Sequence, residues 1–224
     1  MWNWDFALSI LPKLFDVIGI TISATLLGFV MAAILGLLFA FGRRSRFKAL
    51  SLATAGIVEF IRSTPLLIQL YFLYFALPFY GIELSAFTIG VLGLGVHYST
   101  YLSEVYRAGI NDVPRGQWEA ATALNFSKIQ TWMRIVLPQA IRPVTPMLGN
   151  YLIVMFKETP LLSTITVVEL MQTAKIIGSQ SFRYLEAFTI VGLLFLLLSY
   201  PSSLLFRRLE IRLNRQVQRK GVGM

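Results

Sequence analysis

The chain has 224 residues, of which 56% are hydrophobic and 14% charged, and a mean hydropathy of +0.67, which places it among membrane proteins. Its net charge of +9 does not indicate a nucleic-acid partner, because the basic residues lie beside apolar segments, as the positive-inside rule predicts. Without cysteine there is no disulfide or thiolate site, and the single His97 cannot form a metal site by itself.

Residues 1–16 form a short aromatic segment before the first span, and Pro12 is expected to break the helix between the two. Residues 17–42 are uncharged and long enough to cross a hydrocarbon core of ~30 Å. Small residues recur along this span at near-helical spacing: Gly19, Ala24, Gly28, Ala32, Gly36 and Ala40. Such a pattern predicts close packing against another helix. The basic run that begins at Arg43 predicts that this end is cytoplasmic and the N-terminus outside.

Two further spans are predicted next. Residues 49–61 read as an interfacial helix, and an uncharged span over 63–82 starts near Pro65, a residue suited to a first helical turn. The third span covers 85–106. Its polar residues stand at i, i+4 and i+7, so they share one helix face: His97, Tyr101 and Glu104.

Residues 111–138 form a polar, helix-prone insert. Gln117 to Leu124 predicts a short helix, and Asn125 can end it in the left-handed conformation. Ser127 and Gln130 have the spacing of a capping box that opens a second helix, which Pro138 is expected to end. The small Ala120 and Ala121 would let the surface of a partner approach closely.

The fourth span, over 139–168, is broken at 157–160, where charges and Pro160 interrupt it. Asn150, Lys157 and Glu158 share a face at i, i+7 and i+8. Charged residues at membrane depth are site candidates by default. The fifth span covers 187–206 and precedes a basic tail.

The distribution of charge predicts the topology. Fifteen of the 20 Lys and Arg residues fall on one side, at 43–48, 107–142 and from 207 onward. We therefore predict an all-α membrane protein of five transmembrane helices in a single domain over 1–224, with the N-terminus outside and the C-terminus cytoplasmic. No internal repeat is visible, so a second, similar chain should complete a transport path.

The polar insert resembles a segment of a known protein family. Glu119-Ala120-Ala121, a turn residue, and Ile135 to Pro138 resemble the EAA loop of ABC-importer permeases, although Asn125 stands where that family usually has glycine. The resemblance implies a type I importer permease fold and a coupling helix that seats on an ATPase subunit. The coupling-loop residues would be Gly116, Gln117, Glu119, Ala120, Ala121, Asn125, Leu137 and Pro138. The alternative is an ordinary amphipathic loop, in which Glu119 only caps or orients its helix.

Other stretches resemble the polar amino acid branch of these permeases: 62–69, 101–117, 148–150 and 157–159. That branch more often has Asp at Glu158 and Ser at Pro160. Residues 157–164 and their flanks are most similar to permeases for ectoine and hydroxyectoine. An importer for glutamate, glutamine or basic amino acids is the alternative within the class.

Partners follow from the resemblance and from what the chain lacks. It has no G-x-x-x-x-G-K-[ST] loop and no catalytic signature, so we expect no enzyme activity and no bound cofactor or metal. ATP and Mg would be used by a partner ATPase in two copies. We further expect a second permease chain, an extracytoplasmic solute-binding protein, membrane lipid, and residence in the bacterial inner membrane.

The predicted substrate path consists of His97, Tyr101, Glu104, Asn150, Lys157 and Glu158. Lys157 could meet a carboxylate and Glu104 or Glu158 a cationic group, which suits a small zwitterion. Alternatively, the three charges pair with one another, His97 is an interhelical hydrogen-bonder, and Arg62 and Arg107 anchor the cytoplasmic ends. An ATP-independent carrier or channel, or a purely structural assembly subunit, would be functions of another class.

Overall fold

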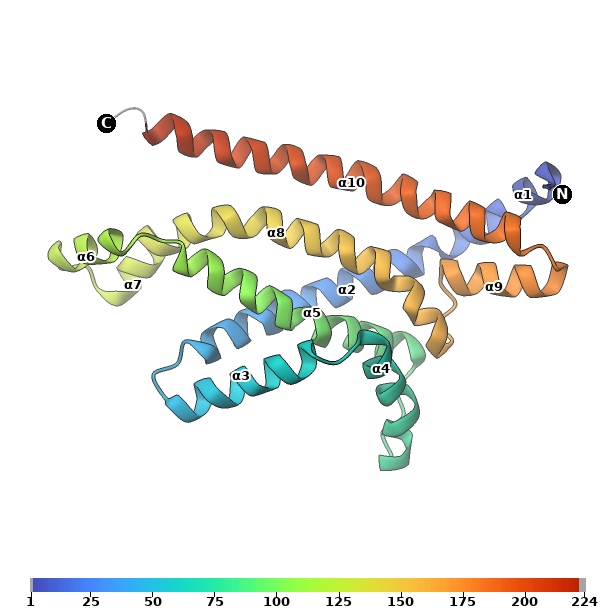
Figure 1. Ribbon diagram of the computed structural model, residues 1–224, viewed down its shortest axis with the longest axis horizontal. Helices are drawn as coiled ribbons and strands as arrows, with labels where there is room; N and C mark the ends of the chain where they lie inside the picture. Colours follow the sequence, from blue (N-terminus) through green and yellow to red (C-terminus); the bar gives the residue numbers. More distant parts are fainter. Residues whose placement is uncertain (1, 222–224) are drawn as a thin grey trace.

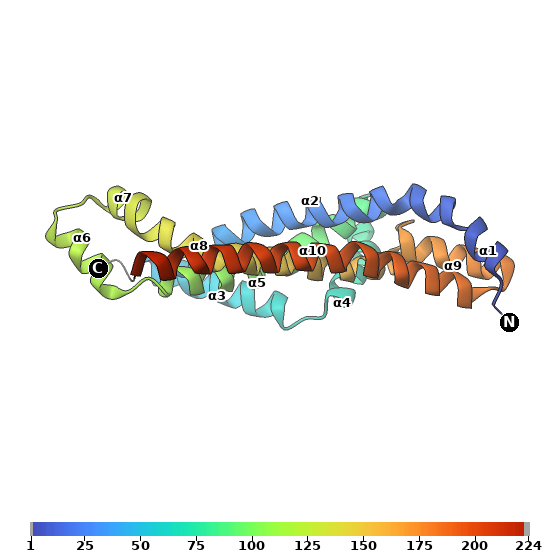
Figure 2. The ribbon, with the colours of Figure 1, turned by 90° about the horizontal axis from the view of Figure 1, so that it is seen from above.

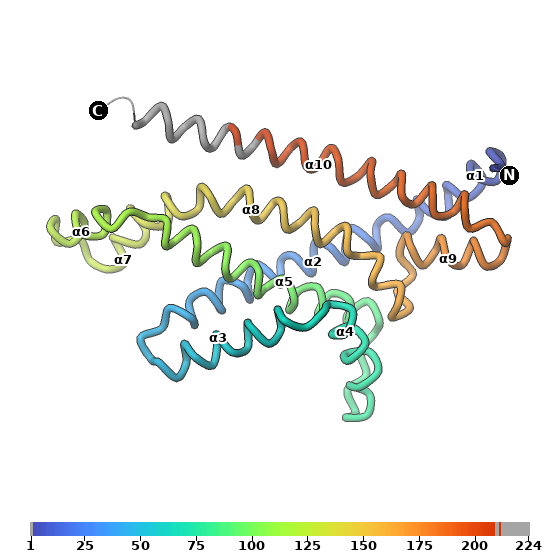
Figure 3. Tube along the Cα trace, in the orientation of Figure 1, coloured from blue at the N-terminus to red at the C-terminus, as the bar shows by residue number. Residues whose placement is uncertain are grey.

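The computed structural model describes residues 2–221, with side chains described to Arg208 and at Ile211, and every element in this part is helical. Figures 1 and 2 show a long, flat arrangement with the N-terminus at one end and the C-terminus at the other. The α-helices are α1 Trp4–Ser9, α2 Leu11–Arg43, α3 Lys48–Arg62, α4 Leu66–Tyr71, α5 Ala86–Asn111, α6 Arg115–Ala123, α7 Lys128–Thr131, α8 Leu137–Glu158, α9 Leu170–Ser181 and α10 Tyr184–Gly221. Tighter or wider helical turns complete the chain, whose path is traced in Figure 3: η1 Phe72–Ala76, η2 Leu77–Tyr80, η3 Trp132–Val136 and η4 Thr159–Ile165.

A close-packed seam joins α2 to α5. The small residues of α2 at four-residue spacing, from Ala24 to Ala40, are all buried. A methyl group on Gly36 would come within 2.8 Å of the Ser99 carbonyl oxygen, and one on Gly28 within 3.1 Å of Leu94. The predicted close approach of helices is therefore confirmed at these positions. Gly19 is the exception, because it is exposed and has nothing within 4 Å.

We expect Gly36→Ala to lower the free energy of unfolding by about 1–3 kcal/mol, the usual cost of overpacking. The added methyl group would meet backbone on α5, which cannot turn aside as a flexible side chain can. Gly19→Ala is the matched control, since open space surrounds that glycine on the same helix. Unfolding of the two variants in detergent provides the measurement, and equal stability would contradict the packing described here.

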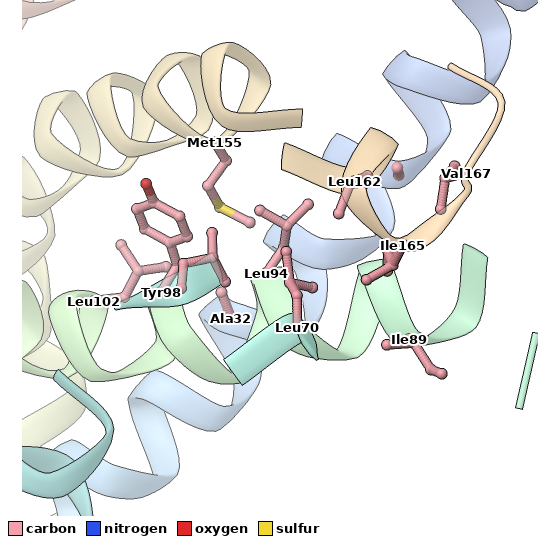
Figure 4. Packing of buried hydrophobic residues seen from close by; sticks show 12 residues of the cluster. Ala32, Leu70, Ile89, Leu94, Tyr98, Leu102, Met155, Leu162, Ile165 and Val167 are labelled. Carbon is pink, nitrogen blue, oxygen red and sulfur yellow. The ribbon is translucent and has the colours of Figure 1, made fainter. Parts of the chain in front are cut away.

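The apolar core lies where α2, α4, α5, α8 and η4 meet. Figure 4 shows Met155 of α8 pointing toward Leu94 of α5, with Leu70 of α4 and Leu162 of η4 alongside. All four side chains are fully buried. This core holds the two halves of the broken fourth segment against α5, and so positions the polar residues of both.

The chain turns sharply between α3 and α4. The two segments Lys48–Arg62 and Leu66–Tyr80 are bent by 97°. Pro65 explains the break, because a proline disfavours helical geometry in the residue before it. The Gln69 side chain then fixes the elbow by donating to the carbonyls of Ile61 (2.7 Å) and Thr64 (3.0 Å).

In the described part of the chain, two helices are by themselves long and apolar enough to cross a membrane, Leu11–Arg43 and Tyr184–Arg208. The number rises to four if each bent pair is one crossing, the second pair being Lys128–Ile165 with Leu170–Ser181, bent by 49°. The predicted third span lies in α5, which is 26 residues long but is not among the helices apolar enough to cross a membrane. The count of five spans and the orientation of the termini thus stay predictions.

The expectation that Pro138 ends a helix is wrong. Helical structure continues from Lys128 through η3 into α8, with Pro138 in the first turn of α8. Proline lacks the N–H that would bond to the carbonyl four residues back. The wider π-type turn η3 lies directly before it, and such turns are a recognised way for a helix to absorb a local misfit.

Candidate functional site

The polar insert is a two-helix projection at one end of the molecule, formed by α6 and α7 (Figure 1). α6 ends in a Schellman motif: the Phe126 N–H donates to the Ala121 carbonyl and the Asn125 N–H to the Thr122 carbonyl, both at 3.0 Å. Asn125 has a φ of 54°, as predicted for a residue in the glycine position. The departure from the family pattern is therefore accommodated by the backbone.

A capping box opens α7, as predicted. The Gln130 N–H donates to the Ser127 hydroxyl (3.3 Å), and the Ser127 N–H donates to the Gln130 side-chain oxygen (2.9 Å). Trp118 of α6 packs against Trp132, the residue directly after α7. Their rings meet edge to face with centroids 5.5 Å apart. The projection is thus a rigid unit built on the start of α8.

The projection also leaves an outward surface. Glu119 and Ala120 are exposed, as are Gly116, Gln117 and Pro138, whereas Leu137 is half-buried. Three large apolar side chains are exposed on or directly after the two helices: Leu124 (68%), Ile129 (76%) and, in η3, Met133 (62%).

One expectation is corrected at this surface. Ala121 is fully buried and cannot meet a partner, so of the two alanines only Ala120 is available for contact. The inward-facing Ala121 serves the Schellman turn, because its carbonyl accepts the bond from Phe126.

We expect Asn125→Val to destabilise the turn by about 1–2 kcal/mol, the cost of left-handed backbone for residues other than Gly, Asn and Asp. A β-branched side chain is poorly tolerated there, whereas Asn125→Gly keeps the required freedom and is the matched control. Hydrogen exchange at the Phe126 amide should be faster in the valine variant only. Equal exchange in both variants would mean that the turn does not depend on residue 125.

An aromatic cluster lies between α5 and α8. His97, Tyr98 and Tyr101 of α5 have ring centroids 5.3–5.8 Å apart, and Tyr151 of α8 lies 6.0–6.1 Å from both tyrosines of α5. Glu158, the last residue of α8, is half-buried beside the Tyr98 hydroxyl. Tyrosine faces next to a carboxylate can attract a cationic group, since ring quadrupole and charge act in the same sense.

A second polar cluster surrounds Glu104. Its carboxylate contacts Arg43 of α2, accepts a bond of 2.7 Å from Arg107, and lies 3.9 Å from Arg62 at the end of α3. Arg62 also pairs with Glu59 at 2.8 Å. Glu104 therefore pairs with arginines from three helices, and not with Lys157 as the structural alternative supposed.

The structure brings only some of the predicted path residues together. His97 and Tyr101 contact each other in the aromatic cluster, and Glu158 lies beside Tyr98 of that cluster. Glu104 lies in the arginine cluster, and Asn150 and Lys157 are exposed. His97 is buried, and its Nδ1 makes no hydrogen bond to any described residue, so no interhelical bond through that atom is seen.

Sequence reasoning missed Tyr98, Tyr151 and Arg43. Two signals were present: Tyr98 and Tyr101 stand three residues apart on one helix face, and Tyr151 follows the predicted Asn150. The described residues contain no group of three or more His, Cys, Asp or Glu side chains that could hold a metal ion.

Comparison with known proteins identifies the family. The pattern described as "Binding-protein-dependent transport system inner membrane component" matches residues 24–215. A probable amino-acid ABC transporter permease of Sinorhizobium fredii is 46% identical over 222 residues, which cover 96% of each chain. The L-cystine transport system permease TcyB of Bacillus subtilis is 36% identical, with 92% of this chain and 91% of that protein covered.

A solved structure agrees with this assignment. The crystal structure of an amino acid ABC transporter with histidines contains a chain that superposes with a TM-score of 0.90 at 33% identity, covering 95% of this chain and 99% of that one. The elongated helical arrangement is thus the fold of a type I ABC importer permease. The chain belongs to the binding-protein-dependent inner membrane components, and it is a multi-pass membrane permease subunit of an amino acid ABC importer.

Proposed function

We propose that the permease carries a small zwitterionic solute along a path lined by α5 and α8. The observation that carries this proposal is that Glu158 lies beside the aromatic cluster. The tyrosine ring faces and the carboxylate can both attract an ammonium or amidinium group. Lys157, exposed one residue before Glu158, would meet the carboxylate of the solute. Opposite charges on adjacent residues suit a zwitterion better than a simple cation or anion.

The second part of the proposal concerns coupling. The α6–α7 projection would seat in a groove of an ATPase subunit, with Glu119, Ala120, Leu124 and Ile129 on the contact surface. Its rigidity supports this role, because the Schellman turn, the capping box and the tryptophan pair fix its shape before any partner binds. Two ATPase copies, a second permease chain and an external solute-binding protein would complete the importer.

The chemical class of solute is part of the same proposal. Relatives are named for transport of cystine and of glutamine, which supports a polar amino acid. Ectoine and hydroxyectoine, the solutes that the sequence resemblance indicates, join a carboxylate to a delocalised cation and fit the same arrangement of charges. Glutamate and basic amino acids are the remaining members of the panel to be tested.

Co-purification tests this function directly. A C-terminally tagged chain expressed with its genomic neighbours should retain a subunit that carries the ATP-binding phosphate loop. Replacement of Glu119 to Ala121 by a glycine-serine segment should release that subunit. A panel of ectoine, hydroxyectoine, glutamine, glutamate, cystine and arginine, applied to the reconstituted complex, would then identify the solute. A chain that purifies alone and moves solute without ATP would overturn the proposal in favour of a carrier or channel.

A further inference from the structure

The arginine cluster around Glu104 holds more positive charge than its carboxylates balance. Arg43, Arg62 and Arg107 face two acidic partners, Glu104 and Glu59. Each guanidinium has five N–H donors in a planar fork suited to carboxylates. The cluster as described therefore has both the charge and the donors to accept one more carboxylate.

The cluster is accessible and not sealed in the core. The side chains of Glu104 and of the three arginines are 21–35% exposed. A cavity of about 380 Å³ adjoins Glu104, with walls from α5 and α8 that include Gly109, Asp112 and Met147; the three arginines border Glu104 but do not line this cavity. A small solute would have space beside the carboxylate.

The cluster also continues the aromatic cluster along α5. Tyr101 stands three residues before Glu104, so the two side chains share a helix face. A solute that leaves the tyrosines toward the basic end of α5 would meet these arginines next.

We propose that Arg43, Arg62 and Arg107 form a carboxylate-binding site at the inner end of the path, which Glu104 occupies until the carboxylate of the solute displaces it. The proposal rests on the proposed transport function. Arg62 is the arm most ready to exchange partners, because its contact with Glu104 is the longest, at 3.9 Å, and it sits at the α3–α4 elbow. Competition from Glu104 would keep the solute from being trapped and so favour its release.

Free acetate tests the site independently of transport. In Glu104→Ala, acetate should fill the vacated position and raise the midpoint of thermal unfolding of the assembled complex, whereas chloride at equal ionic strength should not. Glu59→Ala is the matched control, since that exposed carboxylate contacts Arg62 alone among the three arginines. If Glu104→Ala does not assemble in chloride, the readout becomes assembly itself, which acetate should restore and chloride should not. Acetate and chloride acting alike, or acetate acting equally without Arg107, would overturn the carboxylate site.

A second readout tests the link to transport. In proteoliposomes of the complex, L-glutamine on the cytoplasmic side should inhibit uptake at least about fivefold more strongly in Glu104→Gln than in wild type, the lower end of usual coupling between sites. The amine 4-aminobutanamide, which lacks the carboxylate, should show no such gain. If acetate stabilises the variant but glutamine does not inhibit it more strongly, the site does not bind the carboxylate of the transported solute. Absence of ATP-driven uptake in wild type would instead count against the proposed function.

Discussion

Glu158→Gln and Lys157→Met are each expected to reduce uptake by the assembled importer at least about tenfold, because a hydrogen bond to a charged group contributes ~1.5–3 kcal/mol and each ~1.4 kcal/mol is tenfold. The first substitution keeps the size of the side chain beside Tyr98 and removes its charge. The second keeps the apolar stem of the lysine and removes its ammonium group. The measurement is the initial rate of solute uptake in proteoliposomes.

Two variants of the same chemistry provide the controls for these substitutions. Glu83→Gln and Lys13→Met change an exposed carboxylate and an exposed ammonium group outside the α5–α8 clusters, and should leave uptake unchanged. Membrane insertion and retention of the ATPase are checked in every variant. Normal uptake kinetics in both of the tested variants would show that the adjacent charges of Lys157 and Glu158 do not serve the substrate path.

Glu119→Lys should uncouple ATP hydrolysis from transport. Glu119 is exposed in the middle of α6, so reversing its charge changes the contact surface without disturbing the fold of the projection. We expect substrate-stimulated hydrolysis to fall to the basal rate while solute binding to the external protein is unaffected. The measurement is phosphate release with and without loaded binding protein.

The control for this reversal is Glu83→Lys, the same change at an exposed position in the turn before α5. Stimulation should persist in that variant. If hydrolysis in Glu119→Lys remained fully stimulated, the ATPase would have to dock elsewhere on the permease, and the exposed surface of α6 would need another explanation.

Features set by local spacing could be predicted from the sequence. The capping box at Ser127 and Gln130, the left-handed Asn125 and the small residues of α2 each depend on neighbours within one or two turns. Such patterns have a direct geometric meaning along a helix. The family resemblance rested on the same local stretches and was confirmed at the level of the amino acid permeases.

Features set by the meeting of distant segments could not be predicted. Two of the three partners of Glu104, Arg43 and Arg62, come from the ends of α2 and α3, and nothing at residue 104 indicates which helix ends will surround it. Ala121 was expected to contact a partner, whereas its side chain is fully buried once the insert is folded. The turn η3 was missed because a proline can either end a helix or be absorbed by a wider turn beside it.

The seam between α2 and α5 constrains how this protein can diversify. At Gly36 the opposing atoms are backbone, and at Gly95 the opposing group is Met31, so each glycine is matched to a particular volume across the seam. An enlargement on one helix can persist only with a reduction on the other, or with a shift of both axes that would disturb the polar clusters carried by α5. Substitutions that change the solute are therefore expected on the face of α5 that carries His97 and Tyr101, and not at this seam.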